Sequence, residues 1–330
     1  MCGFDSIPSN LAVFAAVQAL VAKSKRNKGA AVQIDKATTF HSLVGSVNGG
    51  TLHTMLDFPV DMRECFSHPV PYMVDDPLVL APPKIREDPK HQKTRNRFAL
   101  CEWLNLLPFT HSIFMGGFSA PSFMSAANAK VVFASSLALD YGPGFVYYER
   151  FLPVGFRGTR NYKTLSLIPV VLTQLGLLLL FVLLKLPVVG KKLADWWLPP
   201  GTGMSDEFCQ AGHVQVYAEV VASVPTPEGN PTAAQHGLAD YKANCLLQFD
   251  GDPGNWTTAQ CVSEAALALV LDRKDLPPRG NSTKHDGFGT PAELLGSALL
   301  KRLTNTKIRP AQCVTHVRKH VPQHEWRMYP

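Results

Sequence analysis

The sequence lacks every common phosphate-binding loop. Its glycine-rich segments are GSVNGG (45–50), GFRGTRN (155–161) and GTGMSD (201–206), and none reads G-x-G-x-x-G between a strand and a helix. The Walker loop, the G-x-S-x-G elbow and the H-E-x-x-H helix are missing as well. Enzyme classes that need one of these devices within the 330 residues are therefore disfavoured.

The sequence also lacks paired cysteines and a concentration of charge. Its seven cysteines are widely separated and never form a C-x-x-C pair, which favours reduced thiols. No basic region follows Met1, so no secretory signal or transit peptide is predicted, and we expect a chain that is not secreted. The net charge of +6 is spread along the chain, and nucleic acid is therefore disfavoured as a partner.

The strongest physical signal that is present is a run of twenty uncharged residues, Leu165 to Leu184. At about 1.5 Å per residue, a helix of this length spans the roughly 30 Å hydrocarbon core of a bilayer. Trp196 and Trp197 suit a membrane interface. Because basic residues lie on both sides of the run, no orientation in a membrane is predicted. The alternative is a buried helix or a helical hairpin of a soluble domain, broken near Pro169 and Gly176.

Composition and periodicity predict the main helices. An apolar helix packed on both sides is expected over 11–22, and a buried segment over 109–139. Two helices are expected near the C-terminus, over 256–271 and 290–303. The second of these begins with a Thr-Pro-Ala-Glu capping box at 290–293.

Four segments have the composition of strands. Two short strands are expected over 30–35 and 40–47. Period-two alternation over 212–222 and 241–249 predicts a pair of antiparallel strands with one face in water.

A C-x2-H-x3-H-x3-H pattern near the C-terminus resembles a zinc site. It comprises Cys313, His316, His320 and His324, but Pro322 interrupts the helix that would place the last two on one face. A solvated basic tail is the preferred interpretation, and no metal is expected.

Four segments, in this order and at these separations, carry a resemblance to a known family. They are CGFDSIPSN (2–10), NGGTLHTML (48–56), GDPGNWTTAQ (251–260) with EAALALVLD (264–272), and GTPAELLGSALLKRL (289–303). The chain resembles the saccharopine dehydrogenase-like oxidoreductases, which include the mycobacterial trans-acting enoyl reductases. The resemblance runs from Cys2 to about Leu303.

The resemblance implies an α/β to α+β fold, in which a Rossmann-type nucleotide domain precedes the first of these segments. The chain begins at that segment, so we expect a truncated form. Residues 1–29 and 251–330 would be the remnant and the returning helices of the nucleotide domain. Residues 30–250 would form an inserted mixed-sheet domain on the substrate side, with a membrane-associated hydrophobic segment at about 164–189.

The resemblance also implies hydride transfer from NADH or NADPH to an unsaturated or carbonyl group. No arginine is clearly placed to clamp an amino-acid carboxylate, which favours a lipid-type substrate over saccharopine. For these residues alone we expect no bound NAD(P)H, because a pyrophosphate would lack the backbone donors of a glycine-rich loop.

The partners and the compartment that the resemblance implies are lipidic. They are a lipid-type small molecule and a membrane or lipid monolayer, with lipid droplet, mitochondrion or plasma membrane as the site and glycolipid synthesis as the setting. The alternative is a non-enzymatic membrane or lipid-droplet protein. A homo-oligomer, or a subunit that completes its cleft with another chain, stays open.

The resemblance places the GFDSIPS turn beside the cofactor pocket. Gly3 would permit close approach of the backbone, Asp5 or Ser6 would offer acceptors, and Pro8 fits the first turn of the following helix. The alternative is a turn that only caps this helix. Asn10 stands where family members often have Asp, so a role that requires a carboxylate there is in doubt.

The pair Gly49 and Gly50, followed by a predicted helix start at Thr51, resembles a glycine pair on the substrate side of the family's cleft. The glycines would let the backbone approach a ligand, and Thr51 would add a hydroxyl. A tight strand-to-helix turn requires the same glycines, which is the alternative. The sequence assigns no catalytic residue.

Overall fold

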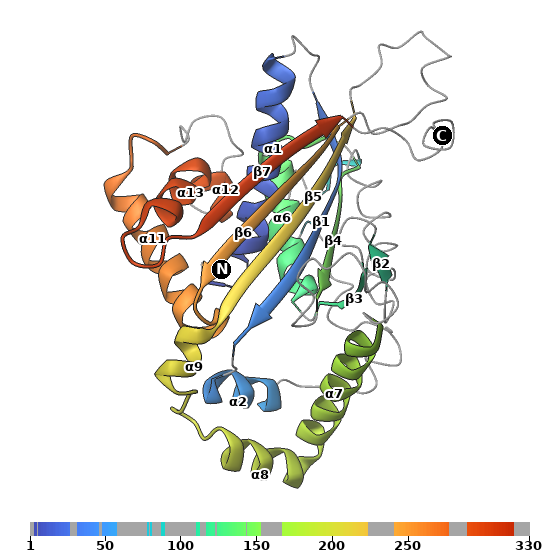
Figure 1. The fold of residues 1–330 in the computed structure, drawn as a ribbon, viewed down its shortest axis with the longest axis vertical. Coiled ribbons are helices and arrows are strands. Elements are labelled where there is room, and N and C mark those ends of the chain that lie inside the picture. The colour runs from blue at the N-terminus through green and yellow to red at the C-terminus, as the bar shows by residue number, and fades with distance from the viewer. Residues whose placement is uncertain are drawn as a thin grey trace.

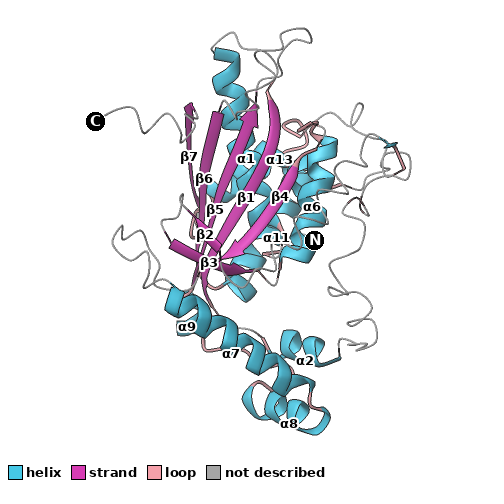
Figure 2. Ribbon diagram, turned by 90° about the vertical axis from the view of Figure 1, so that its right-hand side faces the viewer, coloured by secondary structure: helices cyan, strands magenta, loops and turns pink. Residues whose placement is uncertain are grey.

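The fold is a mixed sheet with helices packed against one of its faces (Figures 1 and 2). The computed structural model describes residues 3–4, 6–26, 32–45, 48–57, 78, 80, 87–89, 110–112, 117–122, 124–142, 144–152, 167–223, 241–276 and 289–319. Within these residues the sheet has seven strands in the order β2-β3-β4-β1-β5-β6-β7. This is an α/β fold, whereas a Rossmann remnant stays a prediction.

Three long strands form the centre of the sheet: β1 (Gln33–Val44), β5 (His213–Ser223) and β6 (Tyr241–Asp250). β5 and β6 are antiparallel over their whole length, as their alternating pattern predicts. The shorter strands are β2 (Thr110–Ser112), β3 (Gly117–Pro121), β4 (Val146–Phe151) and β7 (Gln312–Lys319). β4 runs parallel to β1, and each other neighbouring pair is antiparallel.

The prediction of two strands over 30–35 and 40–47 is wrong, because β1 is continuous. The residues between the two predicted strands, 36–39, are mostly polar, which favoured a break in the strand. In the structure Ala37 and Thr39 are fully buried on the helix-covered face, while Lys36 lies 4.8 Å above the ring of Tyr148. A bulge between Ile34 and Lys36 lets the strand keep this alternation.

The helix-covered face is built around α1 (Ile7–Arg26), which lies against β5, β6 and β7. This helix is buried over most of its length, as predicted for a helix packed on both sides. α6 (Ser125–Ala138) packs against α1 and β4. It lies in the 109–139 segment, whose burial in β3 and α6 is confirmed. α11 (Thr258–Leu271) completes the layer and is entered through a π-helical turn, η2 (Pro253–Thr257).

The helix expected over 290–303 is divided into α12 (Pro291–Leu294) and α13 (Gly296–Asn305). The predicted capping box is confirmed: the Thr290 hydroxyl accepts from the Glu293 amide, and the Glu293 carboxylate accepts from the Thr290 amide. The division occurs at Gly296, whose φ is +35°. A Cβ there would lie 3.0 Å from the ring of Phe14, so glycine lets the chain bend against α1.

The helices from both ends of the chain pack on strands from its middle in one hydrophobic core. The division into 1–29 with 251–330 and an inserted 30–250 therefore stays a prediction. Cys313 and His316 lie in β7 rather than in a helix, whereas His320 and His324 lie outside the described residues. The part of the chain that the structure describes contains no group of three or more metal-ligating side chains.

Four helices lie beyond one end of the sheet: α2 (Gly49–Asp57), α7 (Leu167–Lys185), α8 (Pro187–Trp197) and α9 (Asp206–Ala211) (Figure 2). Only 12% of the segment Leu167–Leu184 is buried. The alternative of a buried helix broken near Pro169 and Gly176 is therefore wrong, since α7 is continuous and exposed. By length and composition, Ile7–Ser24 is also apolar enough to cross a membrane, but it is 72% buried in the core.

Candidate functional site

Three of the four segments that carry the family resemblance meet at residues 252–258, between the strand β6 and the helix α11. Asp252 begins this segment: its carboxylate accepts hydrogen bonds from the amides of Asn255 at 3.1 Å and Trp256 at 3.0 Å. This side chain caps the helix start in the usual manner of an N-terminal Asp. We call residues 252–258 the motif junction, because both predicted groups of site residues flank it.

The first predicted group, at the start of α1, contacts the motif junction directly. The Phe4 amide donates to the Thr258 hydroxyl at 3.2 Å, and a Cβ on Gly3 would lie 3.1 Å from Thr258 Cγ2. The close approach that Gly3 permits is therefore to Thr258. Ser6 and Pro8 are buried at the beginning of α1, while Asp5 lies outside the described residues.

The second predicted group forms the start of α2. The helix begins at Gly49 and not at Thr51, so the expected tight turn before Thr51 is wrong and Thr51 is the third helical residue. A Cβ on Gly49 would overlap the carbonyl oxygen of Pro199, whereas a Cβ on Gly50 would meet no atom within 4 Å. One glycine of the pair is therefore required by packing, and the other faces open space.

An amide pair that the sequence interpretation missed joins the second group to the motif junction. Asn48 donates to Asn255 at 2.7 Å, and Asn255 donates back to Asn48 at 3.2 Å. Gly45, at the end of β1, packs directly on the Pro253 ring. Each asparagine lies in one of the segments that carry the resemblance, and this is the sequence signal that could have identified the pair. Whether these groups contact a ligand stays a prediction.

Asn10, the position at which the resemblance implied a carboxylate, is bound on both sides of its amide. Its side-chain oxygen accepts from the Ala292 amide at 2.8 Å, and its NH2 donates to Ser135 at 2.7 Å. Asn10 therefore holds the start of α12 against α1 and α6, which is a structural role.

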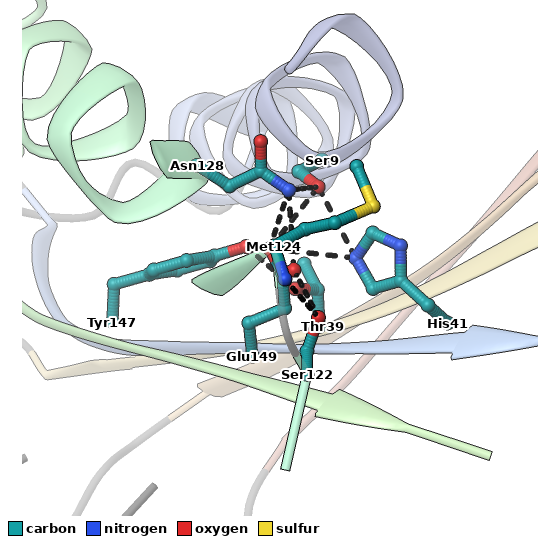
Figure 3. A network of polar contacts seen from close by, with 8 residues as sticks. All are labelled: Ser9, Thr39, His41, Ser122, Met124, Asn128, Tyr147 and Glu149. Atoms are coloured by element: carbon teal, nitrogen blue, oxygen red, sulfur yellow. Dashed lines mark hydrogen bonds and ion pairs between the residues drawn. The ribbon is translucent and has the colours of Figure 1, made fainter. Parts of the chain in front are cut away.

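A buried polar network lies behind the start of α1, between the helices and the sheet (Figure 3). At its centre is Glu149, which has no exposed surface. We call the network the Glu149 cluster; its members are Ser9 from α1, Thr39 and His41 from β1, Ser122 after β3, Asn128 from α6, and Tyr147 and Glu149 from β4. The parallel pairing of β1 with β4 brings Thr39 opposite Glu149.

The Glu149 carboxylate is surrounded by donors. It accepts from Ser122 Oγ and Tyr147 OH, each at 2.7 Å, and from Asn128 Nδ2 at 2.9 Å. His41 Nε2 lies 3.6 Å away and also contacts Ser9 Oγ at 3.1 Å. Since a buried carboxylate is stable only when it is well hydrogen-bonded, this arrangement fixes the side chains of five separate elements relative to one another.

Burial and the Glu149 charge shift the pKa values of two neighbouring groups, His41 and Tyr147. Burial lowers the pKa of His41 below its usual 6.5, although the nearby Glu149 charge opposes the shift. Burial and the same charge raise the pKa of Tyr147 well above 10. Within the described residues, His41 Nδ1 and Asn128 Oδ1 are buried polar atoms without a hydrogen-bond partner. The lowered pKa therefore favours a neutral imidazole at His41 at neutral pH.

The sequence is similar to two curated proteins of Mycobacterium tuberculosis, one from strain H37Rv and one from strain CDC 1551, each provisionally named a trans-acting enoyl reductase. Each is 29% identical to this chain over 318 residues. The alignments cover 92% of this chain and 64% of each relative, so the chain spans less than two thirds of their length. No family model and no solved structure matches the chain. The comparison agrees with the enoyl reductase part of the resemblance and does not single out saccharopine dehydrogenase.

The lowered pKa of His41 predicts a loss of stability in acid. Below about pH 6.5 the unfolded chain takes up a proton at this histidine that the folded chain does not bind. The free energy of unfolding should fall as the pH drops through this range, by at most about 1.4 kcal/mol per pH unit, and the loss stops below the folded pKa. Urea unfolding between pH 7.5 and 5 should therefore show a steeper pH dependence for the natural chain than for His41→Gln. Equal slopes would contradict the prediction.

Proposed function

We propose that the chain forms the substrate-side part of a saccharopine dehydrogenase-like oxidoreductase, which reduces a lipid-type substrate with NADH or NADPH in lipid or glycolipid metabolism. The observation that carries the proposal is the meeting of distant segments: Gly3, Phe4, Gly45 and Asn48 all contact residues 252–258. The similarity to two named enoyl reductases over 92% of the chain supports it.

The described residues do not fit the pyrophosphate of a nicotinamide nucleotide. Among the described residues, Gly45 at the end of β1 and Gly49 at the start of α2 come nearest to a glycine-rich cradle, but protein atoms already occupy the space beside both. A cradle requires that such glycines leave their backbone open to the ligand. In this proposal a substrate lies beside Gly50, which is exposed and where an added Cβ would meet no atom within 4 Å.

The Glu149 cluster would act as a positioning device in this function. It ties Ser9, the last residue of the GFDSIPS turn, to the strands β1 and β4. The start of α1, the motif junction and the sheet are thereby held in one arrangement. The cluster touches no substrate in this proposal, because each of its side chains is buried.

Nucleotide binding by the purified chain should be absent at micromolar concentration. We expect no saturable change in NADPH or NADH fluorescence on titration, because the phosphate-binding loop is missing from 45–50 and from the rest of the sequence. An intact NADPH-dependent reductase provides the positive control. Saturable binding with micromolar affinity would contradict the prediction.

Substrate binding tests the proposal without the nucleotide. A long-chain trans-2-enoyl thioester should bind the purified chain and quench tryptophan fluorescence. Gly50→Leu should weaken this binding about tenfold or more, because a large side chain would fill the space beside α2, and a 1.4 kcal/mol loss corresponds to that factor. Far-UV circular dichroism checks that the variant folds. The proposal fails if the thioester does not bind, or if Gly50→Leu leaves its affinity unchanged.

A second candidate is a non-enzymatic protein of an intracellular membrane or lipid droplet, and the exposed apolar helix α7 favours it. Binding of the enoyl thioester also distinguishes the two candidates. The second predicts recovery with lipid but no affinity for the enoyl thioester.

A further inference from the structure

α7 presents leucine, isoleucine and valine side chains to the surroundings along its whole length. The exposed members are Ile168, Val171, Leu172, Leu175, Leu177, Leu178, Leu179 and Val182. Leu172, for example, is 64% exposed. A soluble domain rarely exposes a continuous apolar surface of this kind unless something covers it.

Both ends of α7 are attached to the same globular body. Near its start, Val170 is fully buried and the helix packs against β3. At its end, Leu184 belongs to a hydrophobic cluster with Leu52 of α2 and Ala194 of α8. The helix therefore extends beyond the end of the sheet but is held at both ends, by β3 at its start and by α2 and α8 at its end (Figure 1).

The chain returns to the body too soon for α7 to cross a bilayer. α7 has 19 residues and is about 28 Å long, which is close to the roughly 30 Å of a hydrocarbon core. α8 has only 11 residues and is about 16 Å long, so it cannot lead the chain back across. Shortly after α8, Thr202 accepts a hydrogen bond from the Gly49 amide at 3.0 Å. The path thus starts and ends on one side.

α8 has the composition of a helix that lies in a membrane interface. One row of its surface carries Val188, Lys192 and Trp196, spaced four residues apart, and Trp196 is 82% exposed. Lys191 is also exposed. Tryptophan favours the headgroup region, and lysine is attracted to anionic headgroups. The opposite side packs on α7, so closely that a Cβ on Gly190 would overlap the carbonyl oxygen of Leu184.

We propose that α7 and α8 form a lipid-binding hairpin, Leu167–Trp197, which inserts into one leaflet of an anionic phospholipid membrane without crossing it. The exposed leucines of α7 enter the acyl region, and the tryptophans and lysines of α8 lie among the headgroups. This inference does not depend on the proposed enzymatic function, because it uses neither the motif junction nor a cofactor.

Flotation of the full chain with vesicles tests whether the exposed leucines of α7 enter the acyl region. The chain should float with vesicles of phosphatidylcholine containing phosphatidylserine. L172E/L175E/L179E should reduce the partition coefficient by about tenfold or more for each leucine, as the burial of a leucine side chain predicts. The control V270E/L271E changes two equally exposed apolar residues on α11 and should float like the natural chain. Equal flotation of both variants, or no flotation of the natural chain, would overturn the proposal.

The charge of α8 is tested with the same vesicles. K191E/K192E should lower the affinity for vesicles with phosphatidylserine by about fivefold per lysine and abolish the preference over neutral vesicles. The control Lys301→Glu alters an exposed lysine of α13 and should keep the preference. A preference that survives K191E/K192E would contradict the anionic part of the proposal.

Oil droplets coated with a monolayer of the same phospholipids distinguish one leaflet from two. A hairpin in one leaflet should bind droplets and vesicles with similar affinity, because it needs only one layer of headgroups. A helix that crosses the bilayer cannot be accommodated in the oil-backed monolayer, since no second polar surface exists. Recovery with vesicles but not with droplets would overturn the single-leaflet arrangement.

Discussion

Replacing Glu149 by leucine is expected to lower the free energy of unfolding by about 3–5 kcal/mol. The substitution removes the acceptor for Ser122, Asn128 and Tyr147, and these donors are buried where water cannot replace it. A buried donor left without a partner costs about 1–3 kcal/mol, and Tyr147 and Asn128 keep Thr39 and Ser9 as second partners, so the loss stays below the full cost of three such donors. Urea unfolding followed by far-UV circular dichroism and by tryptophan fluorescence measures the loss.

Glu219→Leu is the matched control. Glu219 is also a glutamate in a strand of this sheet, but it lies on the open face and its partner is the partly exposed Lys242, at 3.5 Å. The change in unfolding free energy should stay within about 1 kcal/mol, as for a pair that water can reach. If Glu149→Leu does not fold, Glu149→Gln keeps one acceptor oxygen and should give an intermediate loss. A loss below about 1 kcal/mol for Glu149→Leu would show that the network is not what holds these elements together.

The sequence predicted elements whose signal is local. The strands β5 and β6 followed from alternation, α1 from its uninterrupted apolar composition, and the start of α12 from its capping box. The exposed helix α7 followed from the absence of charge over its length, although only the structure shows that it is not buried. Each of these features is encoded within about twenty consecutive residues.

The Glu149 cluster could not be predicted in this way, because its members come from five places in the chain. Two patterns were nevertheless available: Thr39-x-His41 and Tyr147-x-Glu149 place polar residues two apart in otherwise buried strands. In a strand this spacing puts both side chains on one face. Thr39 was placed in a break between two predicted strands and His41 in the second of them. The partner pattern in β4 depends on a parallel pairing that periodicity does not reveal.

The glycine pair shows a different limit of sequence interpretation. Close packing and ligand approach both require glycine, so the residue type alone does not separate them. In the structure the two demands fall on neighbouring positions: Gly49 is packed against the backbone of residues 198–199, and Gly50 faces open space. Substituting each glycine by alanine therefore adds one methyl group at two adjacent positions of the same helix, one packed and one open.

Gly49→Ala is expected to destabilise the protein by about 1–3 kcal/mol, because the added methyl group would force apart two backbone segments. A flexible side chain could move away, but the atom that it meets is the carbonyl oxygen of Pro199. Gly50→Ala should instead raise the free energy of unfolding by about 0.5–1 kcal/mol, since alanine favours the helix and meets no atom. Urea unfolding of the two variants side by side measures both signs.

The opposite signs of these effects separate packing from ligand contact. If Gly50 lines the substrate site, Gly50→Ala should weaken binding of the trans-2-enoyl thioester while the protein becomes more stable, a combination that damage to the fold does not produce. Gly49→Ala should weaken binding only in proportion to the fraction that unfolds. Unchanged affinity for Gly50→Ala together with unchanged affinity for Gly50→Leu would remove α2 from the site. A stabilising Gly49→Ala would show that the contact with Pro199 does not limit this position.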